Sequence, residues 1–91
     1  EFLANIFVVV KSELAESLNT IQESIEKEDL KLINEAGHKL YGTAISAGME
    51  ILAGIANEIE HLEKFDADRL GELFAQLKEE LNLVLDLMDS D

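Results

Sequence analysis

His38 has the setting in this sequence that best suits chemistry, because Gly42 follows it four residues later inside a stretch with helical periodicity. A glycine in the middle of a helix costs roughly 0.5–1 kcal/mol relative to alanine, so some benefit must offset that cost. On a helical wheel, both residues lie far from the apolar stripe of their helix. We therefore expect the imidazole to face solvent beside bare backbone, where a second protein can approach a nucleophile closely.

Two Glu-x-x-His pairs, Glu35 with His38 and Glu58 with His61, raise the alternative of a metal site. This spacing occurs in ferritin-like di-iron bundles, where the ligands project inward. Here both histidines lie away from the apolar stripes, and turning either helix to bury its pair would expose large apolar side chains at roughly 1.5–3 kcal/mol each. We therefore expect no metal ligands, and we interpret His61 as an exposed polar residue near a helix end.

Four amphipathic helices must position these side chains, because apolar residues recur every three or four positions along most of the chain. The expected helices span about residues 2–27, 30–46, 49–63 and 67–88. Since the connections between them are only a few residues long, consecutive helices must run antiparallel. The sequence therefore predicts an all-α fold, an antiparallel up-down-up-down four-helix bundle.

Local signals mark several helix ends and one helix face. Asp29 suits the N-cap of the second helix, Gly48 suits the left-handed position that ends it, and Asp66 or Asp68 suits the cap of the fourth helix. In the third helix we expect Ile51 to lie on the core face.

The composition excludes several classes of function. Twenty acidic and seven basic residues give a net charge of −13, which repels phosphate backbones and anionic membranes, so we expect neither nucleic acid nor membrane contact. No apolar stretch reaches the ~18 residues that span a bilayer. The chain of 91 residues has no cysteine, which suits one domain in the cytoplasm.

The sequence around His38 carries a resemblance to a known family. An apolar residue follows the histidine at +2, glycines follow at +4 and +10, and an apolar helix then ends in isoleucine and glutamate. These positions are Leu40, Gly42, Gly48, Ile59 and Glu60. The pattern resembles the histidine-phosphotransfer (HPt) domains of bacterial two-component phosphorelays, and four helices with the histidine on the second is also that family's plan. Residues 1–91 would then be a single HPt domain.

The resemblance implies that His38 accepts a phosphoryl group from, and donates it to, receiver-domain aspartates of response regulators, with Nε2 as the expected nucleophile. It implies a phosphocarrier without kinase or phosphatase activity and without a cofactor, since the magnesium would belong to the partner receiver. We expect a cytoplasmic monomer and, because the chain begins without methionine, a piece of a hybrid sensor kinase. The alternative is a helical protein-interaction module that leaves His38 idle.

One position departs from the family pattern. The usual lysine at +3 is Tyr41 here, and Lys39 stands at +1. Lys39 could contact phosphoryl oxygens from the other flank through a charge-assisted hydrogen bond, or it could be a solvated surface charge. We expect Tyr41 to pack at the edge of the core, with a hydroxyl donor as the alternative. Glu35, one turn before His38, should favour the charged form of the imidazole and repel an incoming phosphoryl group. We expect this carboxylate to be tolerated because it is solvated.

Overall fold

The structure, a computed structural model, describes the backbone of residues 2–89 and the side chains of residues 8–86. Residues 1, 90 and 91, which the expected domain includes, lie outside the described part. The four helices are α1 (Phe2–Glu26), α2 (Leu30–Ser46), α3 (Glu50–Glu60) and α4 (Ala67–Asp89). No strand occurs between residues 2 and 89, so the all-α prediction is confirmed.

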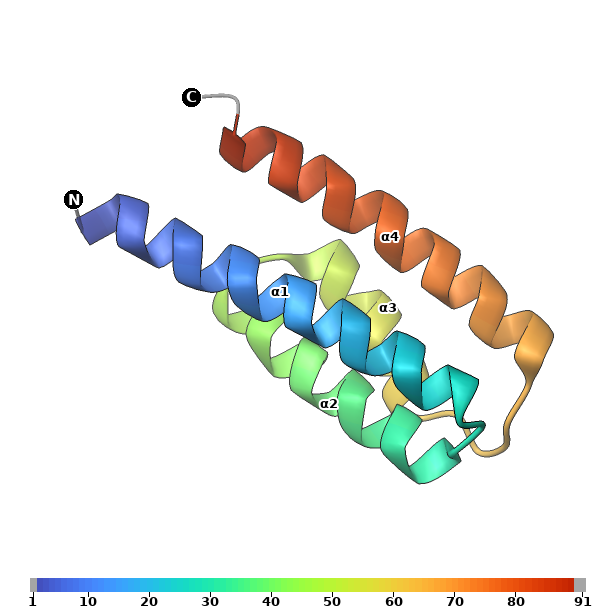
Figure 1. Cartoon of the computed structure of the whole chain (residues 1–91). Helices are drawn as coiled ribbons and strands as arrows, with labels where there is room; N and C mark the ends of the chain where they lie inside the picture. Colours follow the sequence, from blue (N-terminus) through green and yellow to red (C-terminus); the bar gives the residue numbers. More distant parts are fainter. Residues whose placement is uncertain (1, 90–91) are drawn as a thin grey trace.

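Consecutive helices run in opposite directions, and the start of α1 and the end of α4 lie at the same end of the molecule (Figure 1). Within the described residues, α1 packs against α2 and α4, α3 packs against the same two helices, and the backbones of the diagonal pairs do not come close to each other. This is the expected antiparallel four-helix bundle. α2 and α3 lie side by side as a hairpin. This hairpin brings together the two helices that carry the residues of the family pattern.

The core of the bundle receives apolar side chains from all four helices. The largest fully buried ones are Leu14, Ile21, Ile33, Leu40, Leu52, Ile59, Leu70, Leu73 and Leu77. The placement of Ile51 on the core face was wrong, since this side chain is 66 % exposed. The core-facing arc of α3 is formed by Leu52, Ala53, Ala56 and Ile59. Ile51 precedes that arc by about 100° of helix rotation.

The two turns that flank α2 follow the expected local signals. The carboxylate of Asp29 accepts a hydrogen bond from the backbone amide of Leu32 at 3.2 Å, which caps α2. Gly48 has φ +75°, the left-handed conformation expected after the helix. Glu28 also has a positive φ, 53°, in the turn between α1 and α2.

α3 ends at Glu60, three residues before the expected end at 63. A contact from α2 favours this end: the side-chain amide Nδ2 of Asn34 donates to the carbonyl oxygens of Ile59 at 3.0 Å and, just beyond the helix, of Leu62 at 3.2 Å. The carbonyls of a last helical turn have no partner within the helix, and a side-chain donor that satisfies them favours an end at that point. No signal local to α3 could have shown this, because the donor comes from another helix.

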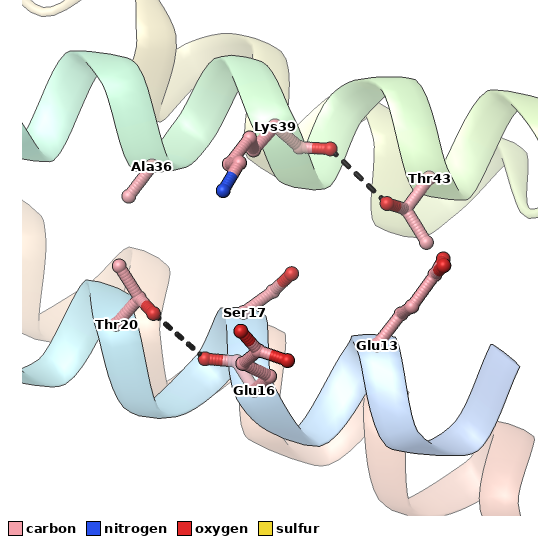
Figure 2. A pocket seen from close by; sticks show the side chains of 7 residues that line it. All are labelled: Glu13, Glu16, Ser17, Thr20, Ala36, Lys39 and Thr43. Carbon is pink, nitrogen blue, oxygen red and sulfur yellow. Dashed lines mark hydrogen bonds between the residues drawn. The ribbon is translucent and has the colours of Figure 1, made fainter. Parts of the chain in front are cut away.

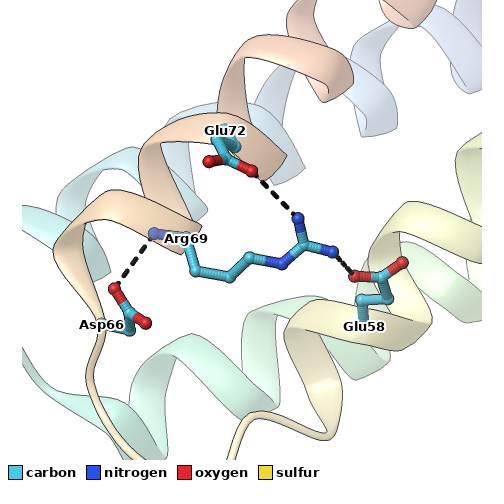
Figure 3. Close-up of polar contacts among 4 residues, drawn as sticks. All are labelled: Glu58, Asp66, Arg69 and Glu72. Carbon is cyan, nitrogen blue, oxygen red and sulfur yellow. Dashed lines mark hydrogen bonds and ion pairs between the residues drawn. The ribbon is translucent and has the colours of Figure 1, made fainter.

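An ion-pair cluster at the end of the α3–α4 connection joins the two helices (Figure 3). The guanidinium of Arg69 donates to Glu58 of α3 and, at 3.1 Å, to Glu72 of α4. Hydrogen bonding and charge from Glu58, with smaller contributions from Glu72, raise the pKa of Arg69 above its ordinary value. Asp66, rather than Asp68, accepts from the backbone amide of Arg69 at 3.1 Å and so caps the first turn of α4.

Candidate functional site

His38 lies near the middle of α2, with 72 % of its side chain exposed. Its Nδ1 lies 2.8 Å from Oε2 of Glu60, the last residue of α3. The Glu60 side chain is only 23 % exposed, so most of it is covered by neighbouring residues. The imidazole is therefore open to solvent and still held at one nitrogen.

This contact decides which ring nitrogen is available for chemistry. An ionised carboxylate only accepts hydrogen bonds, so Nδ1 of His38 must carry the proton that is donated to Glu60. In the neutral ring, Nε2 then holds the free electron pair. A carboxylate that fixes the tautomer and orientation of a reactive imidazole is a recurring arrangement in enzyme sites.

Gly42 lies one turn after His38 and is exposed. Among the described residues, a Cβ added at Gly42 would meet no heavy atom within 4 Å. The backbone beside the imidazole is therefore bare, in the way that the sequence predicted.

Lys39, the residue after His38, lies over the groove between α1 and α2 (Figure 2). This α1–α2 groove has a volume of about 300 Å³. Its lining residues are Glu13, Glu16, Ser17, Thr20, Ala36, Lys39 and Thr43. The Lys39 ammonium points toward α1, and it forms no ion pair with another residue of the described part. Lys39 also lines, together with His38 and Glu60, a shallow surface groove of about 600 Å³.

Two other residues near His38, Tyr41 and Glu35, differ in how far they are buried. Tyr41 is half-buried and packs against the core, which is the packing role expected for it. Glu35 is exposed and does not pair with His38. The carboxylate that meets the imidazole is that of Glu60, which the sequence marked only as part of a family pattern.

The two Glu-x-x-His pairs are not brought together in the core. His61 is exposed just after α3, where its Nδ1 lies 2.8 Å from the carbonyl oxygen of Asn57, and Glu58 pairs with Arg69. The described part of the chain holds no group of three or more His, Cys, Asp or Glu residues placed to bind a metal ion. No helix in that part is both long and apolar enough to cross a membrane.

A four-helix bundle with an exposed, carboxylate-held histidine on its second helix defines a class of protein suited to carry a group on that imidazole. The family model for the Hpt domain matches residues 5–87, and the chain therefore belongs to the Hpt domain family. Hpt domains are phosphocarriers of two-component phosphorelays rather than kinases or phosphatases, and they interact in general with response-regulator receivers. No curated protein and no solved structure matches the chain.

Proposed function

We propose that His38 is the phosphoacceptor of this domain and that it exchanges a phosphoryl group with the aspartates of response-regulator receivers. The observation that carries the proposal is the 2.8 Å contact between Nδ1 of His38 and Glu60, because it leaves Nε2 as the free nucleophile on an exposed ring. Family membership supports the reaction class.

In the proposed reaction, the Nε2 electron pair of His38 attacks the phosphorus of the receiver's aspartyl phosphate. The new N–P bond forms as the acyl O–P bond breaks, and the receiver aspartate leaves as a carboxylate with the electron pair of that bond. The ring gains a positive charge, which the adjacent carboxylate of Glu60 stabilises through the Nδ1–H bond. The reverse reaction returns the phosphoryl group, so the direction of flow depends on the partner.

Positioning and charge compensation dominate phosphoryl transfer, so a rigid helix that presents one nucleophile is sufficient on this side of the reaction. In the proposal, the magnesium ion and the acidic pocket belong to the receiver, and this chain supplies no cofactor. We propose that Lys39, which follows His38 and lies over the α1–α2 groove, supplies a charge-assisted contact to the phosphoryl oxygens during transfer. We further propose that the domain acts as a monomer in the cytoplasm, within a hybrid sensor kinase.

A phosphotransfer assay tests the proposed function. Receiver domains are labelled with radioactive acetyl phosphate and are then mixed one by one with this domain. We expect at least one receiver to transfer its label, giving an acid-labile product on the wild-type domain and none on His38→Gln. Far-UV circular dichroism should be the same for both. His61→Gln is the matched control and should keep the label, since it removes an exposed imidazole from the same bundle.

Label that persists on His38→Gln would show that the phosphoacceptor lies elsewhere. A wild-type domain that binds a receiver stably but accepts label from none would favour the alternative, a helical interaction module in which His38 is idle.

A further inference from the structure

Gly37, the residue before His38, is buried at the place where α2 crosses α3. A Cβ added there would lie 2.7 Å from the backbone nitrogen of Glu60, 2.9 Å from Cγ2 of Ile59 and 3.0 Å from the carbonyl oxygen of Ala56. Two of these three atoms belong to the backbone and cannot rotate away. The two helices can therefore approach this closely only because residue 37 has no side chain.

This property distinguishes Gly37 from the other glycines of the chain. Within the described residues, a Cβ at Gly42, Gly54 or Gly71 would meet nothing within 4 Å. The sequence placed Gly37 on the core stripe of its helix, but a glycine on a stripe does not by itself reveal a close backbone contact.

Asn34 makes a second contact with the same turn of α3. It lies one turn before Gly37 on α2, is half-buried, and donates from Nδ2 to the carbonyl oxygens of Ile59 and Leu62. These carbonyls belong to the residue immediately before Glu60 and to the second residue after it. The last turn of α3 is thus held to α2 by a close backbone fit and by two hydrogen bonds.

Both contacts act on the placement of Glu60. Gly37 faces its backbone nitrogen, Asn34 fixes the chain on either side of it, and its carboxylate then lies 2.8 Å from Nδ1 of His38. A hydrogen bond of this length does not survive when the helices move apart by an ångström, because hydrogen bonds longer than about 3.5 Å are not made.

We propose that Gly37 and Asn34 are positioning residues that set the tautomer and the orientation of the His38 imidazole through Glu60. Their role in transfer rests on the proposed function of His38, whereas their effect on the imidazole does not. When Glu60 is displaced, the exposed ring rotates and divides between its two neutral tautomers. Only molecules with a free electron pair on Nε2, directed outward, remain able to attack.

The test compares Gly37→Ala and Asn34→Leu with Gly71→Ala, which makes the same glycine-to-alanine change on α4 in open space. Asn34→Leu keeps the size of the side chain and removes its donor, so it tests the proposal separately if the larger residue at position 37 prevents folding. The first readout is the tautomer of His38, measured by long-range ¹⁵N–¹H correlation NMR at a pH where the ring is neutral, with His61 as the internal reference.

We expect the Nδ1–H form of His38 in the wild type and in Gly71→Ala, and a mixture of tautomers in the other two variants. The second readout is the initial rate of transfer from the best receiver of the panel. We expect this rate to fall about 10-fold or more in Gly37→Ala and Asn34→Leu, in line with the loss of supporting contacts at other sites.

An unchanged Nδ1–H tautomer in a folded Gly37→Ala or Asn34→Leu variant overturns the proposal, whatever its transfer rate. A changed tautomer with an unchanged rate overturns the part that concerns transfer. Neither result bears on whether His38 is the phosphoacceptor, because that is decided by the label on His38→Gln.

Discussion

His38 and His61 are both exposed imidazoles with Nδ1 at 2.8 Å from an oxygen atom. For His61 that oxygen is the carbonyl of Asn57, one turn earlier in the same segment, whereas for His38 it is the carboxylate of Glu60 on another helix. A carboxylate carries a full negative charge that can offset positive charge on the ring, and a neutral carbonyl offers only a dipole. The electrostatic partner therefore distinguishes the two histidines better than their exposure does.

The bare backbone at Gly42 gives a prediction that separates access from stability. In Gly42→Gln, the new side chain projects beside His38 and should slow transfer by about 10-fold, because the receiver can no longer approach to reacting distance. The same change should leave helix content intact and raise stability by about 0.5 kcal/mol, since glycine is a poor helix former. Transfer kinetics and urea denaturation measure the two effects. Gly71→Gln is the control for propensity alone, and equal transfer rates in the two variants would remove the steric explanation.

Lys39 and Tyr41 give a second prediction at this scale. A charge-assisted hydrogen bond worth about 1.5 kcal/mol would be lost in Lys39→Gln, which corresponds to a ~10-fold slower transfer. Tyr41→Phe should leave the rate unchanged, because the ring packs against the core and this packing does not require the hydroxyl; a slower rate would favour the hydroxyl donor. Lys31→Gln on the exposed surface of α2 removes the same charge away from the imidazole. If it slows transfer as much as Lys39→Gln does, Lys39 acts only through net charge.

Among the elements of the fold, the turn after α2 gives a prediction that depends on backbone conformation alone. Gly48 has φ +75° and Gly71 lies within α4, and an added Cβ would touch no neighbour in the described structure at either position. Gly48→Ala should lower the free energy of unfolding by about 1 kcal/mol, because a left-handed conformation is strained for alanine. Gly71→Ala should raise it by a similar ~1 kcal/mol. Urea denaturation measures the change in the free energy of unfolding in both variants. Changes of the same sign would contradict the assignment of a left-handed conformation to Gly48 alone.

The sequence predicted those features of the elements that local patterns control. Periodicity located the four helices, Asp29 and Gly48 marked the ends of α2, and the wheel turned His38 outward. The end of α3 at Glu60 was missed because Asn34, its donor, is 25 residues away from Ile59. Such long-range side-chain contacts have no signature in the spacing of neighbouring residues.

The same limit applies to the candidate site. The pairing of His38 with Glu60 joins residues 22 positions apart, and its geometry depends on how closely α2 and α3 pack. Glu35, only three residues from His38, was the carboxylate that we expected to favour the charged imidazole, because it is near in sequence. The backbone of Glu60 packs closely against Gly37, and its carboxylate, rather than that of Glu35, lies beside the imidazole.

For the whole molecule, the net charge of −13 is the dominant electrostatic feature. Arg69 is one of the few cations that bind carboxylates in the described part, so repulsion among the acidic side chains should outweigh attraction. We expect the melting temperature to rise by about 5 °C between roughly 0.02 and 0.3 M NaCl, because salt screens this repulsion. Thermal denaturation followed by circular dichroism measures it. Glu79→Lys, on the exposed side of α4, should melt higher at low salt and respond less to salt. A melting temperature that falls with salt would show that ion pairs dominate.

The contacts that hold Glu60 and His38 span 22 to 28 residues and all lie within the α2–α3 hairpin. Short separations cost little loop-closure entropy, and helical proteins built from such contacts fold quickly. During synthesis, the hairpin emerges from the ribosome before α4, because chains are made from the N-terminus. The imidazole can therefore meet its carboxylate before α4 has left the ribosome, and the acceptor geometry is among the first tertiary features that the nascent chain can form.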